Sequence, residues 1–183
     1  MNDSLFCPFE THLDRDTALN ILKNTLIGAD DGELFLERCR SEVISFDDGR
    51  LRTSSFDASE GFGLRAVQGE TVGYAHSTEV SEQAMRRATG TVRLAIGKGG
   101  GTLATAPQAT NRKLYSDHNP LSDSTFPAKI DILREIDAYA RGLDRRVVQV
   151  SATIAASHQE VVILRADGPD VSDSRPMVRM NVS

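Results

Sequence analysis

The sequence predicts an α+β fold, in which an antiparallel or mixed β-sheet packs against two or three α-helices and one long connection crosses the surface. Three segments, at about residues 16–27, 81–97 and 125–142, place apolar residues at helical spacing. Two other regions, at about 33–74 and 148–183, alternate apolar and polar residues as strands do. Because strands and helices occur in runs and do not alternate strictly, the pattern indicates α+β and not α/β.

The composition is that of a globular protein, with 39% hydrophobic and 26% charged residues. The 26 Asp and Glu residues outnumber the 21 Lys and Arg residues, which argues against direct nucleic-acid binding because phosphate contacts need a basic face. The two cysteines, Cys7 and Cys39, lie in unlike contexts, so we expect no disulfide framework. No apolar run could span a bilayer and MNDSLFCPFE does not resemble a secretory signal, so we expect a cytoplasmic protein without a membrane partner.

We expect residues 1–15 to form an N-terminal tail and residues 16–183 to form one domain. The domain opens with an amphipathic helix that Asp16 caps and Gly28 closes. The apolar face of this helix consists of Ala18, Leu19, Leu22 and Leu26.

Alternation begins at Glu33 and predicts a β-hairpin. The turn is Asp47-Asp48-Gly49-Arg50, and the strands on either side contain Val43 to Phe46 and Leu51 to Phe56. Asp-Gly between two alternating runs is a strong hairpin signal, because the turn needs a positive φ that glycine adopts without strain.

The stretch EGFGLRAVQGETVGYA contains Gly61-x-Gly63-x-x-Ala66, which matches the spacing of a dinucleotide-binding turn. That turn requires a strand before the glycines and a helix that starts within them. Here the residues after Gly63 predict a strand, a tight turn at Gln68-Gly69 and a further strand. We therefore interpret the glycines, which are Gly61, Gly63, Gly69 and Gly73, as residues that shape a sheet.

A second helix is expected to start at Ser81 and end at Gly97. Its apolar face consists of Ala84, Met85, Ala88, Val92 and Ala95. A long flexible connection, at about 98–127, follows it. The connection begins GKGGG, but a phosphate-binding loop needs Ser or Thr directly after Gly-Lys, so a linker is the favoured interpretation.

Ser124 or Thr125, with Pro127, is expected to open a third helix that Gly142 ends. Its apolar side consists of Ile130, Leu133, Ile136, Tyr139 or Ala140, and Leu143.

The last part of the chain alternates again. Val148, Val150, Ala152 and Ile154 share one face, and a short loop is expected at Ser157 and His158 before a strand from Val161 to Leu164. A loop from Ala166 to Pro176 and a strand from Met177 follow. Because the pattern stops within a strand, we expect the chain to be a piece of a longer protein.

Local spacing assembles no catalytic, metal or cofactor site. A zinc peptidase helix needs two His on one face with a Glu beside the first, and His158-Gln159-Glu160 has no second His nearby. The remaining histidines, His12, His76 and His118, are scattered. Asp167, Asp170 and Asp173 do not match a calcium loop, and a nucleophile elbow is absent from the sequence.

Six strings occur in the order found in one family. They are Asp48-Gly49-Arg50-Leu51, EGFGLRAVQGETVGYA, VSEQAMRRA, DILREIDAYAR, RRVVQVSATI and SRPMVRMNVS. The chain from about Ala18 to Ser183 thereby resembles the N-terminal region of the TldD and PmbA proteins, with the TldD side favoured.

This resemblance implies that the complete protein is a cytoplasmic zinc metallopeptidase, formerly labelled a modulator of DNA gyrase. It implies that the peptidase acts on unfolded or precursor peptides together with a sister subunit or as a homodimer. The family signature H-E-x-x-x-H is absent from this sequence, so the resemblance transfers no catalytic or zinc-binding residue to it. On this basis we expect an inactive N-terminal domain that helps form the substrate chamber and the subunit interface.

The sheet is expected to offer an edge to a peptide or a face to a partner subunit, through main-chain hydrogen bonds. Arg65 and Tyr74 are the candidate contacts, because they are the large polar and aromatic residues on the glycine-bearing strands. Plain scaffolding is the alternative for each residue. For the whole chain, the alternative is an interaction module without peptidase activity, such as a gyrase modulator or adaptor.

Overall fold

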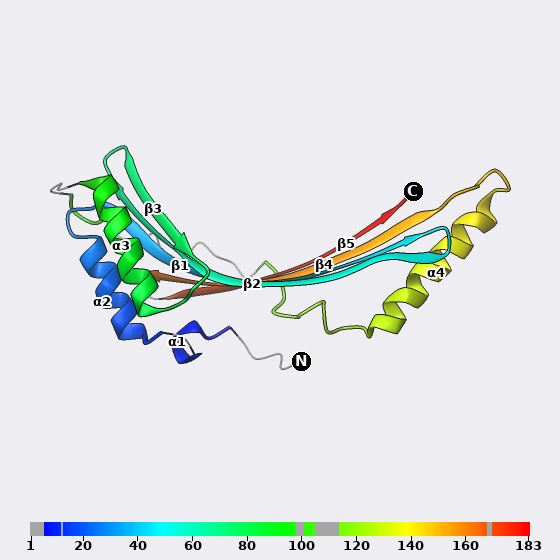
Figure 1. Ribbon diagram of the computed structural model, residues 1–183, viewed down its shortest axis with the longest axis horizontal. Helices are drawn as coiled ribbons and strands as arrows, with labels where there is room; N and C mark the ends of the chain where they lie inside the picture. The colour runs from blue at the N-terminus through cyan, green and yellow to red at the C-terminus, as the bar shows by residue number, and fades with distance from the viewer. Residues whose placement is uncertain (1–5, 12, 98–100, 105–113, 168–169) are drawn as a thin grey trace. The chain divides into compact units, whose positions relative to one another are not determined.

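The protein is α+β, as the sequence predicts, and its strands form one five-stranded sheet (Figure 1). The computed structural model describes residues 6–11, 13–97, 101–104, 114–167 and 170–183. The sheet has the strand order β3-β2-β1-β4-β5. The elements are α1 (Pro8–Thr11), α2 (Arg15–Thr25), β1 (Asp31–Asp47), β2 (Arg50–Gln68), β3 (Thr71–Ser77), α3 (Glu82–Ile96), α4 (Phe126–Leu143), β4 (Ser151–Arg165) and β5 (Val171–Val182).

The chain divides into two compact units that share the long strands. The first unit comprises Met1–Arg38, Ser59–Leu114 and Glu160–Asp173, and it contains α1, α2, β3 and α3. The second unit comprises Cys39–Ala58, Tyr115–Gln159 and Ser174–Ser183, and it contains α4. The chain therefore passes from one unit to the other within β1, β2, β4 and β5. The expected boundary between a tail and a domain at residue 16 stays a prediction.

Two tight turns join the first three strands. Asp48 and Gly49 have φ values of 50° and 71°, the pair of positive angles that a type I′ turn requires, and this confirms the predicted hairpin. Gly69, with φ 54°, begins the two-residue turn between β2 and β3. These strands are antiparallel, with Gln68 opposite Thr71.

Side-chain hydrogen bonds show that β1 and β4 are antiparallel. In the second unit, Ser151 donates to Asp47 over 2.6 Å, and Ser45 and Thr153 share a hydrogen bond of 3.2 Å. Further back along β1 in the first unit, Glu33 accepts from Arg165, at the far end of β4, over 3.3 Å.

β4 corrects the sequence analysis, because the strand is continuous through Ser157 and His158, where we expected a loop. His158 is buried, and its Nε2 lies 2.9 Å from the hydroxyl of Ser174 on β5. Ser157 and His158 therefore lie within a paired strand and do not form a turn.

β5 corrects a second expectation, because it begins at Val171 and contains Pro176, so the expected loop up to Pro176 is too long. An edge strand tolerates proline, since it can leave one N–H unpaired. Val148 is 82% exposed and precedes β4, so it does not share the buried face that we expected.

The core of the first unit lies between the sheet and the pair of helices α2 and α3. Leu34, Leu64 and Met85 are among its fully buried side chains. Asp14, and not Asp16, caps α2 by accepting from the backbone N–H of Thr17.

α3 follows the expected bounds, with Ser81 as its N-cap and Gly97 closing it at a φ of 72°. Its apolar face ends at buried Ile96, whereas Ala95, which we had assigned to that face, is exposed. Ala95 and Ile96 are adjacent, and the rotation of about 100° between neighbouring helical residues turns one outward and the other toward the core.

The second unit has a smaller core, made by α4 against β1 and β4. Its buried cluster consists of Ile44, Phe46, Ile130, Leu133, Ala152 and Ile154. Thr125 caps α4, with Pro127 in the first turn, as predicted. The helix continues through Gly142 to Leu143, and Tyr139 and Leu143 are mainly exposed, so the predicted apolar side is too long at this end.

Part of the expected connection at 98–127 follows the first unit closely. The N–H of Gly101 donates to the carbonyl of Gly28, and the N–H of Ala104 donates to that of Asp30. Residues 98–100 and 105–113 lie outside the described residues.

Candidate functional site

The two candidate residues lie side by side on the face of the first unit that points away from α2 and α3. Arg65 and Tyr74 are direct partners in the β2–β3 ladder. Their neighbours Leu64 and Ala66 are buried in the core, and because side chains alternate along a strand, Arg65 and Tyr74 project from the opposite face. We call this surface the open face. Tyr74 is 58% exposed there.

An ion network of four residues holds Arg65 on the open face. Arg65 bonds Glu33 and Asp31, each over 3.2 Å. Arg165, from β4, bonds the same two carboxylates over 3.3 Å and 2.5 Å. Two positive and two negative charges therefore balance, and the guanidinium of Arg65 is engaged by carboxylates of its own unit. This favours a positioning role for Arg65 over capture of a negative ligand.

Tyr74 lies against the backbone of Gly63. A Cβ atom at Gly63 would lie 2.9 Å from the Tyr74 hydroxyl and 3.1 Å from its Cε2. The ring of His76, which is opposite Gly63, is 5.8 Å from the Tyr74 ring. Glycine at position 63 therefore leaves room for an exposed aromatic pair on the open face.

Two other glycines of this region, Gly61 and Gly73, also allow close packing. A Cβ at Gly61 would meet the carbonyl of Ser77 at 2.6 Å, and a Cβ at Gly73 would meet the carbonyl of Val92 in α3 at 2.6 Å. Gly69 belongs to the turn. β2 runs through Gly61 and Gly63, so this segment lacks the helix start that a dinucleotide-binding turn requires.

Sequence reasoning missed several residues of this surface. Asp31, Glu33 and Arg165 were not singled out, although each is the polar member of an alternating strand pattern, which is the signal that could have found them. Gly32, which lies between Asp31 and Glu33 and faces the core, was also missed: a Cβ there would meet the side chain of Leu26 and lie 2.5 Å from the carbonyl oxygen of Arg65.

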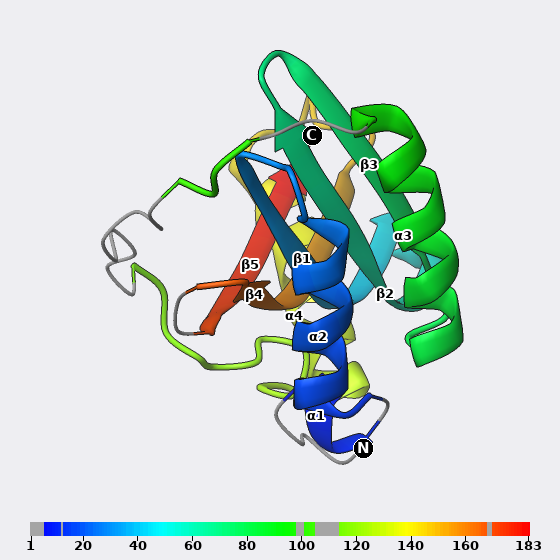
Figure 2. The ribbon, with the colours of Figure 1, turned by 90° about the vertical axis from the view of Figure 1, so that its left-hand side faces the viewer.

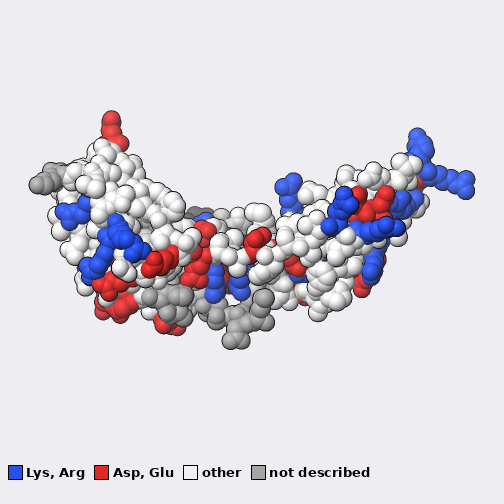
Figure 3. All heavy atoms as spheres, in the orientation of Figure 1, with Lys and Arg blue, Asp and Glu red and all other residues white. Residues whose placement is uncertain are grey.

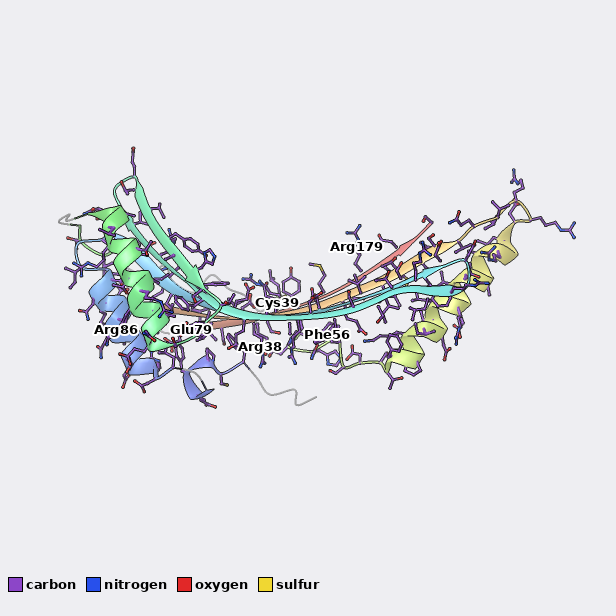
Figure 4. The ribbon with its side chains drawn as sticks, in the orientation of Figure 1. Arg38, Cys39, Phe56, Glu79, Arg86 and Arg179 are labelled. Atoms are coloured by element: carbon purple, nitrogen blue, oxygen red, sulfur yellow. The ribbon has the colours of Figure 1, made fainter. Side chains whose placement is uncertain are left out.

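A charged cluster lies where β3 leads into α3. Hydrogen bonds from the hydroxyl of Ser81 and from Arg87 lower the pKa of Glu79. Arg86 bonds Glu82 one turn along the helix over 2.8 Å. Glu79 and Arg86 are labelled at this end of α3 in Figure 4, and Figure 3 shows basic and acidic side chains intermixed around the helix. The charges here are paired and form no basic surface.

The described residues do not fit a metal centre. Within this part of the chain, no group of three His, Cys, Asp or Glu side chains could hold an ion. His118 contacts Asp123, and Asp170 binds Arg15 through two hydrogen bonds of 2.6 Å and 2.9 Å. His12 lies outside the described residues.

Among the described helices, none combines the length and the apolar character needed to cross a bilayer.

Two family models match the chain in succession. Residues 32–96 match PmbA/TldA metallopeptidase domain 1, and residues 119–183 match the PmbA/TldA metallopeptidase central domain. The first match contributes strand residues to both compact units, so the two sequence domains do not coincide with the two units.

Curated relatives and solved structures agree with these matches. The chain is 31% identical to the metalloprotease TldD homologue of Haemophilus influenzae over its whole length, and 30% identical over 84% of its length to that of Buchnera aphidicola from Acyrthosiphon pisum. It spans 38% and 32% of these two relatives.

Crystal structures show the same fold at low identity. A protein from Bacteroides thetaiotaomicron, described as a candidate modulator of DNA gyrase, matches 91% of this chain with a TM-score of 0.70 and 12% identity, over 39% of its own length. TldE from Thermococcus kodakarensis matches 90% with a TM-score of 0.65 and 14% identity, over 37% of its own length. The chain belongs to the PmbA/TldD metallopeptidase family, whose first and central domains it carries.

Proposed function

We propose that this chain is the non-catalytic N-terminal part of a TldD-like zinc metallopeptidase that processes or degrades unfolded or precursor peptides. The observation that carries the proposal is the succession of the first and central family domains over residues 32–96 and 119–183. The chain contributes walls and contacts around a catalytic region that it does not itself supply.

The remaining parts of the proposal concern the working assembly. Zinc belongs to the complete peptidase. The partner is a sister subunit of the same family or a second copy, and the protein acts in the cytoplasm. The open face and the strand edges of the first unit are the surfaces that help form the substrate chamber and the subunit interface.

The experiment compares the 183-residue chain with a protein of the relatives' full length on one unstructured, fluorescently quenched peptide. We expect the longer protein to cleave the peptide and a chelator to abolish cleavage, while the chain alone leaves the peptide intact with added zinc. Chelator-sensitive turnover by the chain alone would show that its own residues hold the metal and would contradict the proposal.

A second candidate function rests on the structural neighbours described as candidate modulators of DNA gyrase. In that case the chain is an interaction module without peptidase context. Adding the chain to a supercoiling assay separates the two candidates: an effect on gyrase, together with no cleavage by the longer protein, favours the module.

A further inference from the structure

Within the part of the chain that the structure describes, three stretches of strand have a neighbour on one side only, and they differ in how strongly they oppose the addition of another strand. Charged residues and proline on an edge strand oppose pairing with another chain. The outer strand β5 contains Asp173, Arg175, Pro176 and Arg179, the last of which projects from the strand in Figure 4. The part of β2 beyond β3 contains Arg50, Arg52, Asp57 and Glu60. β3, with the sequence TVGYAHS, contains no Lys, Arg, Asp, Glu or Pro.

The β2–β3 register shows which backbone groups of β3 point outward. Gln68 and Thr71 close a two-residue turn, so they form a hydrogen-bonded pair, and such pairs recur at every second position. Gly73 and Ala75 therefore direct their N–H and C=O groups toward β2. The residues that alternate with them, Val72, Tyr74 and His76, direct their N–H and C=O groups away from the sheet.

The side chains of the same three residues lie on the open face and carry no formal charge at neutral pH with His neutral. Val72 is 54% exposed and Tyr74 is 58% exposed. A strand added at this edge would thus meet free main-chain groups in the plane of the sheet, and an apolar and aromatic row beside it. This combination suits an extended, uncharged polypeptide.

α3 opposes antiparallel pairing of β3 with the same strand of a second copy. The helix lies directly over β3, since a Cβ at Gly73 would touch the carbonyl of Val92, and Figure 2 shows α3 alongside β3. Antiparallel pairing of two identical β3 strands would place both α3 helices on one face of the joined sheet. Paired strands are about 4.8 Å apart, whereas packed helices need about 8–10 Å. A single extended peptide carries no such helix.

We propose that the free edge of β3 binds an extended, uncharged peptide as an additional antiparallel or parallel strand, through the backbone groups of Val72, Tyr74 and His76. The inference rests on the proposed function, because it identifies where in the first unit a peptide substrate docks. It assigns Tyr74 a role through its backbone and gives Arg65 none in direct contact.

The test measures binding of a fluorescein-labelled peptide of about eight uncharged, proline-free residues to the 183-residue chain by fluorescence anisotropy. Tyr74→Pro removes one outward N–H without removing a ladder bond, since proline is tolerated where an edge N–H faces solvent. We expect it to weaken binding roughly tenfold, which corresponds to the loss of one hydrogen bond. The matched variant Tyr74→Ala keeps the N–H, and we expect it to bind within about threefold of the parent because main-chain contacts dominate.

A second measurement avoids any effect of the variants on folding. Two peptides are N-methylated, one at its odd-numbered and the other at its even-numbered residues, so each lacks the N–H groups along one edge of the extended strand. The peptide methylated on the edge that faces β3 should not bind the unaltered chain, and the other peptide should still bind it. Equal binding of both peptides would overturn the proposal, as would a Tyr74→Ala variant that binds as weakly as Tyr74→Pro. Self-association of the chain that Tyr74→Pro abolishes would assign the edge to a second copy instead.

The outcomes also separate this inference from the proposed function. If Tyr74→Pro in the full-length protein leaves cleavage unchanged, docking at β3 is wrong and the peptidase proposal stands. If the chain binds the peptide as expected but the longer protein cleaves nothing, the edge is a peptide site and the peptidase proposal is wrong.

Discussion

Helices cover the strands of the five-stranded sheet differently in the two compact units. Among the described residues of the first unit, two helices cover the strands and the apolar core cluster contains eighteen residues. In the described part of the second unit, one helix covers the strands and the cluster contains six residues. Each unit also holds a nearly buried ion pair. Arg38 of β1 and Glu160 of β4 lie 2.9 Å apart in the first unit, and in the second Lys129 of α4 bonds Glu42 of β1 over 2.5 Å and the carbonyl of Leu121 over 3.0 Å. The apolar cluster is smaller in the second unit, so the ion pair should account for a larger share of that unit's stability.

The ion pair of the second unit predicts the largest effect. The side chains of Lys129 and Glu42 are only 9% and 16% exposed, so Lys129→Met would leave a nearly buried carboxylate without its partner. We expect a loss of about 3–5 kcal/mol in the free energy of unfolding. The double variant Lys129→Met with Glu42→Leu should recover most of this loss, and urea denaturation monitored by circular dichroism measures both.

An exposed pair on the same helix provides the control. Arg134 and Asp131 are more than 60% exposed, so Arg134→Met should cost less than about 1 kcal/mol. Similar costs for Lys129→Met and Arg134→Met would show that the second unit does not depend on its buried pair, and the contrast between the units would fail.

Much of the fold, but less of the site, could be predicted from the sequence. The hairpin at Asp48 and Gly49 and the caps at Ser81 and Thr125 are local, because a few neighbouring residues determine the backbone there. The continuity of β4 through His158 is not local, since it depends on pairing with strands far away in the sequence. Local turn chemistry therefore misled the analysis at that point.

The open face shows the same limit. Alternation indicated that Arg65 and Tyr74 share a sheet, but their direct pairing follows from the register that the turn at Gly69 sets. The ion network needs Asp31, Glu33 and Arg165, and the strand order brings Arg165 beside β1 from the other end of the chain. Spacing along the sequence carries no information on such a contact.

A change at the helix–sheet contact of the first unit predicts an intermediate effect. The Cβ of Gly73→Ala would lie 2.6 Å from the carbonyl oxygen of Val92, which is backbone and cannot rotate away. We expect a cost of about 1–3 kcal/mol in the free energy of unfolding, because α3 must shift from β3. Thermal unfolding followed by calorimetry measures this cost.

Gly90→Ala is the matched variant in α3, since a Cβ there would meet nothing within 4 Å. It should stabilise the protein by about 0.5–1 kcal/mol, because alanine loses less backbone entropy than glycine in a helix. If Gly73→Ala and Gly90→Ala change the free energy of unfolding in the same direction, the close contact of α3 with β3 does not limit the residue at position 73.

The smallest effect concerns acid, and it compares one carboxylate from each unit. The N–H and hydroxyl of Thr17 lower the pKa of Asp14 in the first unit, and the hydroxyl of Ser151, followed by Gln149, lowers that of Asp47 in the second. A carboxylate whose pKa is lower in the folded state stabilises the protein above its unfolded pKa, and this stabilisation is lost as the pH falls through the folded value. Both residues should therefore contribute fully above the ordinary value of 3.8 and progressively less below it.

Urea midpoints measured between about pH 6 and pH 2.5 test this for Asp14→Asn and Asp47→Asn against the parent chain. Each variant should flatten the acid part of the curve slightly, because one titrating group is removed. Asparagine still caps a helix, so Asp14→Asn should keep most of the stability at neutral pH. An unchanged acid slope in Asp47→Asn, with a flattened one in Asp14→Asn, would show that helix capping in the first unit is linked to pH and that the strand pair in the second unit is not.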